Sequence, residues 1–328
     1  MPCATNSLYP TIRRLLCAAL LLFALHASAR AACSVQQRAV VALQDIHGHL
    51  LVPVSVNGTT AQFVLDTGAE RSMVTPAAVQ RLDLKLDQWV ATRMRGIGGI
   101  VEHPNALPRS LTLGGVTLER RTVTHDTSLT VGPLAMPPIG GEPVAGLLGR
   151  DFLSLFDLML DMRTDTLTLY DVHGCTGAFL PWTQPYVAIP AQQPIRTAMV
   201  MPVRIDGKPL TALLDTGASA SLLTARGMIR LGLAPERMTG DRTAQSRGVG
   251  PRAVTMHQHR FTSMQIGAEV LHRPLLWAAP IRMAPFVDML LGADWLTGRR
   301  VWISFATSQV FVAAGPLNPA RSATTPHP

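Results

Sequence analysis

An internal repeat that spans most of the chain constrains the fold more than any other feature. Residues 53–75 read PVSVNGTTAQFVLDTGAERSMVT, and residues 202–224 read PVRIDGKPLTALLDTGASASLLT. The two segments align without a gap at an offset of 149 residues, with Leu-Asp-Thr-Gly-Ala in register. A second pair follows, AGLLGRDFL at 145–153 and DMLLGADWL at 288–296, at an offset of 143. Two such pairs in the same order predict two structural units of one kind.

The repeat also sets the expected segment boundaries. We expect a first half at 34–173 and a second half at 198–314, joined by a proline-rich linker at 174–197. The remaining tail, 315–328, is rich in Pro, Ala and Thr and is predicted to be disordered.

Short stretches of alternating hydrophobicity predict an all-β fold with short helices. Val52, Val54 and Val56 alternate with other residues, and Asn57-Gly58 then marks a tight hairpin turn, which Asp206-Gly207 repeats. A glycosylation sequon starts at Asn57, but the turn already accounts for this sequence. Helices are expected after Thr75, where Pro76 suits a first helical position, and after Thr224. The close spacing of turns favours sheets folded on themselves over βαβ units.

The first 32 residues are typical of an export signal. Arg13 and Arg14 precede an apolar run at 15–25, and small residues follow it, with A-x-A sites at 27–29 and 29–31. An uncleaved anchor is the alternative, but the run is short for a span of about 20 residues. A lipoprotein acylated at Cys33 fits poorly because Arg30 lies just before it. No later segment is apolar enough to span a bilayer, so we expect a periplasmic or secreted protein.

Composition excludes several classes of protein. The chain is 47% hydrophobic and 15% charged, which argues against a disordered or acidic-tail protein. Three of its 29 basic residues lie in the signal segment, so the net charge falls from +8 to +5 without it. Since no basic run with interleaved aromatic residues occurs either, nucleic acid is not an expected partner.

Two of the four cysteines lie outside the signal segment, Cys33 and Cys175. In an oxidising compartment they could form one disulfide between the start of the mature chain and the end of the first half. The alternative is two unpaired thiols.

The candidate chemistry lies in the two Asp-Thr-Gly-Ala segments, at 66–69 and 215–218. A pseudo-two-fold axis between the halves would bring Asp66 and Asp215 together, and two carboxylates in contact share a proton. The ionised one could activate a water while the protonated one polarises a carbonyl. The alternative is that each Asp-Thr-Gly segment is only a turn, which the wider duplicated context disfavours. Four residues would support the pair by hydroxyl groups across the axis or by close backbone approach: Thr67, Gly68, Thr216 and Gly217.

On these motifs the sequence resembles the pepsin and retropepsin superfamily of aspartic proteases, in particular bacterial retropepsin-like proteases with two halves in one chain. The resemblance covers most of 45–312. It implies two β-barrel lobes related by a pseudo-two-fold axis, with the active site between them, and catalytic roles for Asp66 and Asp215. Each apolar-apolar-Gly segment, at 147–149 and 290–292, would thread under a catalytic loop. A peptide or protein substrate, no metal, no cofactor and a monomer are also implied.

The resemblance further implies a hairpin flap in each half, at the Gly-rich stretches 95–99 and 247–250, although two ordinary hairpin turns would look the same. Because Glu70 and Ser219 occupy equivalent positions, the cleft should be asymmetric. The expected substrate-binding residues are Ala69, Glu70, Ala218, Ser219, Ile97, Gly98, Gly99, Val249 and Gly250.

Other constellations indicate structural roles. Two histidine pairs, His47 with His49 and His257 with His259, have strand spacing but lack a third metal ligand, so we interpret them as surface or loop residues. Two aspartates that recur after the repeated glycines are expected to cap helices. These are Asp151 and Asp294. Four aromatic residues are expected in the core: Phe152, Phe156, Trp295 and Trp302.

The sequence therefore predicts an exported aspartic endopeptidase that needs no metal or organic cofactor. One alternative is a non-catalytic peptide-binding module that retains the fold. Another pairs the halves in trans between two chains, although the covalent duplication makes an internal pair simpler.

Overall fold

The computed structural model describes residues 32–119, 127–134, 143–195, 198–246, 248–249 and 252–314. The expected signal segment, Ala32 apart, and the expected tail both lie outside these ranges. So does Gly250, one of the residues expected to bind substrate.

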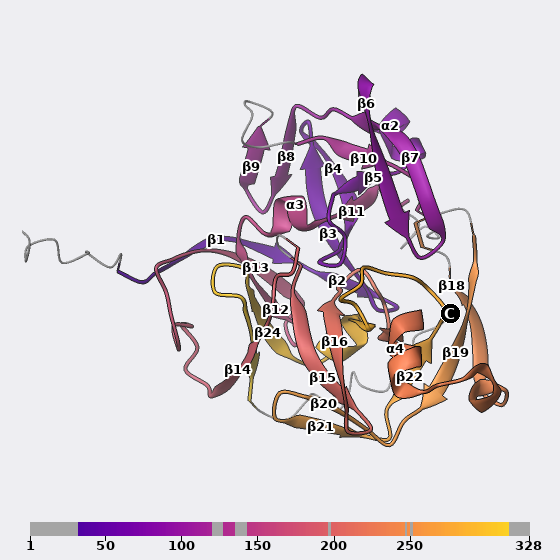
Figure 1. The fold of residues 1–328 in the computed structure, drawn as a ribbon. Coiled ribbons are helices and arrows are strands. Elements are labelled where there is room, and N and C mark those ends of the chain that lie inside the picture. Colours follow the sequence, from indigo (N-terminus) through magenta and orange to yellow (C-terminus); the bar gives the residue numbers. More distant parts are fainter. Residues whose placement is uncertain are drawn as a thin grey trace, which may run out of the picture.

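The first half forms one curled sheet, in the order β6-β7-β10-β5-β11-β4-β3-β8-β9, with β2 paired to β3. In Figure 1 this half lies above the second. Its strands are β2 (Gln44–Ile46), β3 (His49–Val56), β4 (Thr59–Leu65), β5 (Met73–Val74), β6 (Leu86–Gly96), β7 (Gly99–Ala106), β8 (Ser110–Leu113), β9 (Val116–Glu119), β10 (Leu129–Val131) and β11 (Gly146–Leu148).

The second half repeats this sheet strand for strand, in the order β18-β19-β22-β17-β23-β16-β15-β20-β21. In place of β2, the described residues of the second half have an isolated bridge between Gln192 and Val200. The expectation of two β lobes built on one plan is confirmed. The strands are β15 (Val200–Ile205), β16 (Lys208–Leu214), β17 (Leu222–Leu223), β18 (Arg242–Ser246), β19 (Val254–Arg260), β20 (Ser263–Ile266), β21 (Glu269–His272), β22 (Leu275–Ala278) and β23 (Met289–Leu291).

A third sheet joins the halves, in the order β1-β13-β12-β24-β25-β14. Its central pair, β12 with β24, runs antiparallel and comes from both halves. The sheet is therefore as symmetric as the lobes, with β1 and β14 at equivalent edges. The strands are β1 (Ser34–Ala42), β12 (Asp157–Asp161), β13 (Thr166–His173), β14 (Tyr186–Pro190), β24 (Arg300–Ser304) and β25 (Gln309–Ala313).

Strand β14 falls inside the segment that we expected to be a linker. It pairs with β25 from Tyr186 to Pro190. The prolines around it are compatible with this place because an edge strand leaves one row of backbone N–H groups unpaired. Residues 186–190 thus open the second half, as β1 opens the first.

Local signals place the turns and helices where the sequence predicts them. Asn57 and Gly58 both have positive φ, 52° and 89°, as a two-residue hairpin requires. Helix α2 (Pro76–Arg81) is capped by the Thr75 side chain, and α4 (Ala225–Leu231) by that of Thr224. The remaining helices are α3 (Arg150–Leu153), η1 (Pro235–Met238) and α5 (Ala293–Leu296). Across the described ranges, no helix has both the length and the apolar character needed to cross a membrane.

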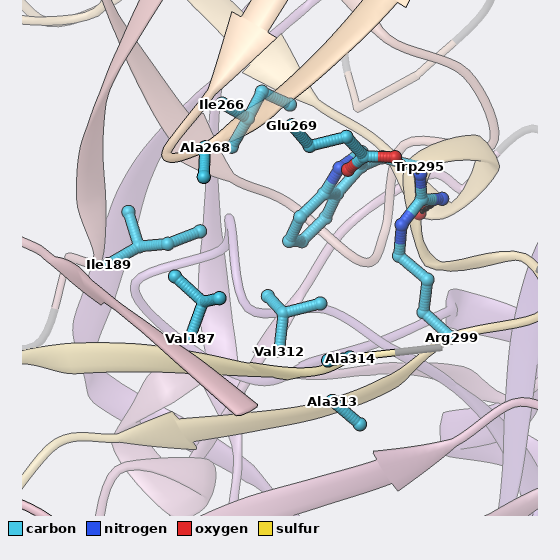
Figure 2. Close-up of a pocket in the computed structure, with 10 residues that line it drawn as sticks. All are labelled: Val187, Ile189, Ile266, Ala268, Glu269, Trp295, Arg299, Val312, Ala313 and Ala314. Atoms are coloured by element: carbon cyan, nitrogen blue, oxygen red, sulfur yellow. Dashed lines mark hydrogen bonds and ion pairs between the residues drawn. The ribbon is translucent and has the colours of Figure 1, made fainter. Parts of the chain in front are cut away.

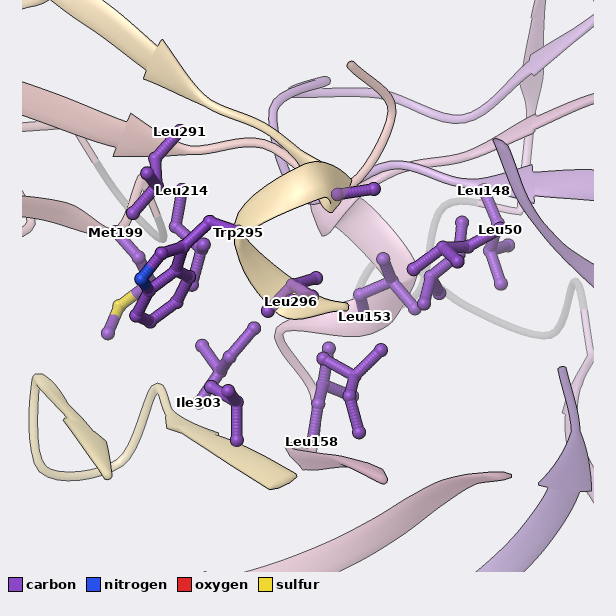
Figure 3. Packing of buried hydrophobic residues seen from close by; sticks show 14 of the residues in the cluster. Leu50, Leu148, Leu153, Leu158, Met199, Leu214, Leu291, Trp295, Leu296 and Ile303 are labelled. Atoms are coloured by element: carbon purple, nitrogen blue, oxygen red, sulfur yellow. The ribbon is translucent and has the colours of Figure 1, made fainter. Parts of the chain in front are cut away.

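The largest hydrophobic core runs through both halves without a break. Figure 3 shows Leu153 of the first half beside Leu296 of the second, with Leu158 and Ile303 of the joining sheet below. Burial of this shared apolar surface holds the two lobes together. The four aromatic residues expected in the core are all buried: Phe152, Phe156, Trp295 and Trp302.

Cys33 and Cys175 are joined by a disulfide in the structure, 142 residues apart in the sequence. The bond fastens edge strand β1 to the chain that follows β13. Replacing both cysteines by serine should lower the free energy of unfolding by about 2–4 kcal/mol. Denaturant unfolding with and without dithiothreitol measures this effect. The reductant should destabilise the wild type and leave the double variant unchanged; equal stability of all samples would contradict the expectation.

Candidate active site

The two Asp-Thr-Gly-Ala loops, at 66–69 and 215–218, begin at the ends of equivalent strands. Asp66 follows β4, and Asp215 follows β16. Strands β11 and β23 lie parallel to β4 and β16, and they extend to the loops. The Asp66 N–H donates to the Leu148 carbonyl at 3.0 Å, and the Asp215 N–H donates to the Leu291 carbonyl at 2.9 Å. Each apolar-apolar-Gly segment thus supports the loop of its own half.

The threonines of the two loops bind each other across the interface between the halves. The Thr67 hydroxyl donates to the Leu214 carbonyl at 2.8 Å and accepts the Thr216 N–H at 3.1 Å. The Thr216 hydroxyl donates to the Leu65 carbonyl at 2.6 Å and accepts the Thr67 N–H at 3.0 Å. Both threonines are fully buried, so water cannot replace these four hydrogen bonds. The pairing occurs within one chain.

The glycines of the loops bring the two carboxyl groups together. A Cβ atom on Gly68 would lie 2.3 Å from Cγ of Asp215, and one on Gly217 would lie 2.4 Å from Cγ of Asp66. Each aspartate side chain therefore occupies the space beside the opposite glycine, where no larger residue fits. Asp215 is 8% exposed and Asp66 somewhat more.

Burial dominates the protonation of this pair. Loss of hydration raises the pKa of Asp66 above its ordinary value, and it raises the pKa of Asp215 further. The charge on Asp66 also raises the pKa of Asp215, and a hydrogen bond between the two carboxyl groups lowers that of Asp66 and raises that of Asp215. The pair therefore holds one proton at any pH between its two apparent pKa values.

A second pair of aspartates, both half-buried, fixes the chain beneath the loops. The Asp151 carboxylate accepts the Ser72 hydroxyl at 2.6 Å, and the same hydroxyl accepts the Gly149 N–H at 2.9 Å. Asp294 binds Ser221 in the same way. As expected, both aspartates also cap an N–H in the first turn of their own helix: Asp151 accepts that of Phe152 at 3.0 Å, and Asp294 accepts that of Trp295 at 2.9 Å. Glycines occupy the formal N-cap positions, and the bonds from each carboxylate to the opposing loop were not expected.

Both Gly-rich stretches belong to long hairpins whose tips meet. Ile97 and Gly98 form the turn between β6 and β7, and Gly248 and Val249 lie between β18 and β19. The Gly98 N–H donates to the Val249 carbonyl at 2.9 Å. A Cβ atom on Gly96 would lie 2.3 Å from the same carbonyl oxygen, so glycine permits this close approach.

The tips cross over to the opposite halves. Ile97, from the first half, packs in a cluster with Ala218 of the second. Val249, from the second half, packs in a cluster with Ala69 of the first. Because Ala69 and Ala218 follow the two aspartates by three residues, the hairpin tips lie against both aspartate loops.

The structure gives the other expected substrate-binding residues different surroundings. Glu70 is exposed, Gly99 begins β7 at the flap turn, and Ser219 is half-buried. The turn between β2 and β3 lies against Ser219, which the sequence did not indicate. A Cβ atom on Gly48 in this turn would lie 2.9 Å from the carbonyl oxygen of Ser219. At the equivalent place in the second half, the described residues form an isolated bridge between Gln192 and Val200.

The histidines are placed partly against expectation. His47 is an exposed turn residue, but His49, His257 and His259 lie half-buried in strands, where alternate positions face the sheet interior. His259 contacts Asp241 at 2.7 Å. Within the described ranges, no three His, Cys, Asp or Glu side chains gather closely enough to hold a metal ion.

A separate pocket of about 210 Å³ lies where the second half meets the joining sheet. Figure 2 shows its apolar walls, which include Val187, Val312 and Trp295, and the Arg299–Glu269 ion pair at one side. Neither Asp66 nor Asp215 lines this pocket.

The chain belongs to the aspartyl protease family. The sequence model of that family matches residues 52–152 and 201–295, one region in each half and each with one Asp-Thr-Gly loop. Among solved structures, the chain is similar to the crystal structure of an aspartic proteinase from Irpex lacteus, with 13% identity and a TM-score of 0.49. That match covers 89% of this chain and 100% of the other. No curated protein sequence matches the chain.

Proposed function

We propose that this protein is an exported aspartic endopeptidase in which Asp66 and Asp215 activate a water molecule for peptide hydrolysis. The observation that carries the proposal is the meeting of the two carboxyl groups, each beside the glycine of the opposite loop. A non-catalytic peptide-binding module has no use for two buried carboxyl groups in contact, since their mutual repulsion destabilises the fold.

The proposed reaction uses the shared proton. One carboxylate accepts a proton from water as the water oxygen attacks the peptide carbonyl carbon, and the protonated carboxyl donates its proton to the carbonyl oxygen. The resulting tetrahedral diol collapses when the protonated carboxyl of the pair gives its proton to the nitrogen and the C–N bond breaks. One hydroxyl of the diol returns a proton to the pair as the carbonyl re-forms. The products are a carboxylic acid and an amine, and the pair again holds one proton. Neither metal nor organic cofactor takes part.

The hairpin tips support a role as two flaps over the substrate. Each tip packs in the same hydrophobic cluster as the alanine of the opposite loop, which supports a position over the loops. The tips then lift to admit a peptide and exclude water from it. We place an extended peptide between the tips and the aspartate loops, in contact with the residues expected from the sequence. Export is supported by the N-terminal segment and by the disulfide, and N-terminal sequencing of the mature protein tests it.

The direct experiment is incubation of the purified protein with a mixed peptide library, followed by mass spectrometry of the products. We expect cleavage at internal peptide bonds, insensitive to metal chelators. Saturable peptide binding without cleavage at any pH from acidic to neutral would favour the binding module instead.

The activity should have a bell-shaped pH dependence. Below the lower pKa of the pair both carboxyl groups are protonated, and above the higher one both are ionised; neither state catalyses the reaction. Because burial raises both pKa values, the acidic limb should lie above the ordinary aspartate pKa, and the alkaline limb well above it. A series of kcat/KM measurements against pH checks this, and a rate that rises steadily to alkaline pH would contradict it.

A further inference from the structure

One buried cation distinguishes the two otherwise equivalent loops. The residue after the supporting glycine is Arg150 in the first half and Ala293 in the second. Both donate a backbone N–H to the alanine carbonyl of the aspartate loop, Arg150 to Ala69 at 3.0 Å and Ala293 to Ala218 at 2.8 Å. Only Arg150 adds a side-chain bond, from its Nε to the Ala69 carbonyl at 3.2 Å.

The charge of Arg150 lies within the protein. The residue is 5% exposed, and its Nη1 atom has no hydrogen-bond partner among the described residues. A guanidinium in this position needs negative charge nearby, because its hydration has been lost. Loss of hydration lowers the pKa of the Arg150 guanidinium, and nearby negative charges oppose this effect, that of Glu70 most, followed by those of Asp66, Asp215 and Asp151.

The hydrogen bonds that the loop N–H groups donate are shorter to Asp66 than to Asp215, as expected if the positive charge of Arg150 favours ionised Asp66. Oδ1 of Asp66 accepts the Gly68 and Ala69 N–H groups at 2.9 and 2.7 Å. The equivalent bonds to Asp215 measure 3.0 and 3.2 Å, and the Ala218 N–H is shared with the Asp215 main-chain carbonyl at 3.3 Å. Shorter bonds from N–H groups are typical of an ionised acceptor.

We propose that Arg150 is a positioning residue that breaks the symmetry of the pair, so that Asp66 is the carboxylate that takes the proton from water and Asp215 is the acid. It acts through its charge and through its hydrogen bond to the Ala69 carbonyl, which helps to fix the residue whose N–H donates to Asp66. The catalytic roles of the two aspartates rest on the proposed function, whereas the order in which they ionise can be measured without peptide cleavage.

The test measures that order with and without the charge. Protein labelled with ¹³C at the aspartate Cγ is titrated by NMR, and the two signals are identified by their loss in Asp66→Asn and Asp215→Asn. In the wild type the Asp66 signal should move at the lower pH. Arg150→Gln removes the charge and should raise the apparent pKa of this first ionisation, called the lower step, by roughly one unit. Arg150→Lys keeps the charge and should restore most of the difference, whereas exposed Arg204→Gln should change nothing.

The outcomes separate this inference from the proposed function. A wild type in which Asp215 ionises first, or an Arg150→Gln variant with an unchanged lower step, would overturn the role of Arg150. If Arg150→Gln does not fold, the wild-type order and the Arg150→Lys titration still decide. In an active enzyme the acidic limb of kcat/KM should move with the NMR step. A correct ionisation order without peptide cleavage would refute the proposed function alone.

Discussion

Replacing Gly217 by alanine should nearly abolish peptide cleavage, with a fall in kcat/KM of roughly a hundredfold or more. The added methyl group would lie 2.4 Å from Cγ of Asp66, so the carboxyl group must move out of its place against the opposite loop. Gly68→Ala should have the same effect through Asp215, which lies 2.3 Å from the added atom. The result depends on geometry, because the substitution removes no functional group.

Gly240→Ala is the matched control for this prediction. No heavy atom lies within 4 Å of a Cβ placed at Gly240, and its φ is not in the left-handed region. This variant should keep wild-type kcat/KM. Full activity of Gly217→Ala, in protein whose fold is verified by circular dichroism, would mean that the carboxyl groups do not meet beside the glycines during catalysis.

Replacing Thr67 by valine should lower the free energy of unfolding by about 2–5 kcal/mol, because it leaves two buried groups without partners. Valine has the shape of threonine, but it can neither donate to the Leu214 carbonyl nor accept the Thr216 N–H. Since both bonds join the two halves, the loss should weaken the interface and the alignment of the aspartates together.

Thr67→Ser retains the hydroxyl and should stay within about 1 kcal/mol of the wild type, the cost of one buried methyl group. Guanidinium unfolding of both variants provides the measurement. Equal stabilities for the valine and serine variants would show that the cross-interface hydrogen bonds contribute little.

The parts of the molecule that could be predicted from sequence are those that short motifs define. Asn57-Gly58 determines its turn through backbone conformation alone, and Thr75 with Pro76 determines a helix start. The Asp-Thr-Gly loops were informative because they occur twice, and a duplicated unit places equivalent residues at its axis. The family match to both halves agrees with this interpretation.

The parts that could not be predicted depend on contacts between distant segments. Strand β14 exists because β25, more than a hundred residues later, offers an edge, and its own sequence with prolines indicates no strand. Asp151 accepts the Phe152 N–H of its own helix, as the sequence predicts, but its bond to Ser72, 79 residues away, has no local signal. Arg150 had a visible signal, the difference between LLGRD and LLGAD, but its meaning needed the burial of the side chain.

The central claim is that Asp66 and Asp215 form one catalytic pair, and the most direct test is kcat/KM for Asp66→Asn and Asp215→Asn, each made singly. Asp83→Asn is the control, since Asp83 is exposed and its positive φ suits asparagine equally well. The two site variants should remain folded. Buried carboxyl groups with raised pKa values destabilise the protein as pH rises through them, so removing one should not reduce stability at neutral pH.

Each site variant should lose activity by about a thousandfold or more, while Asp83→Asn retains it. Peptide cleavage at the wild-type rate by either folded site variant would contradict the account.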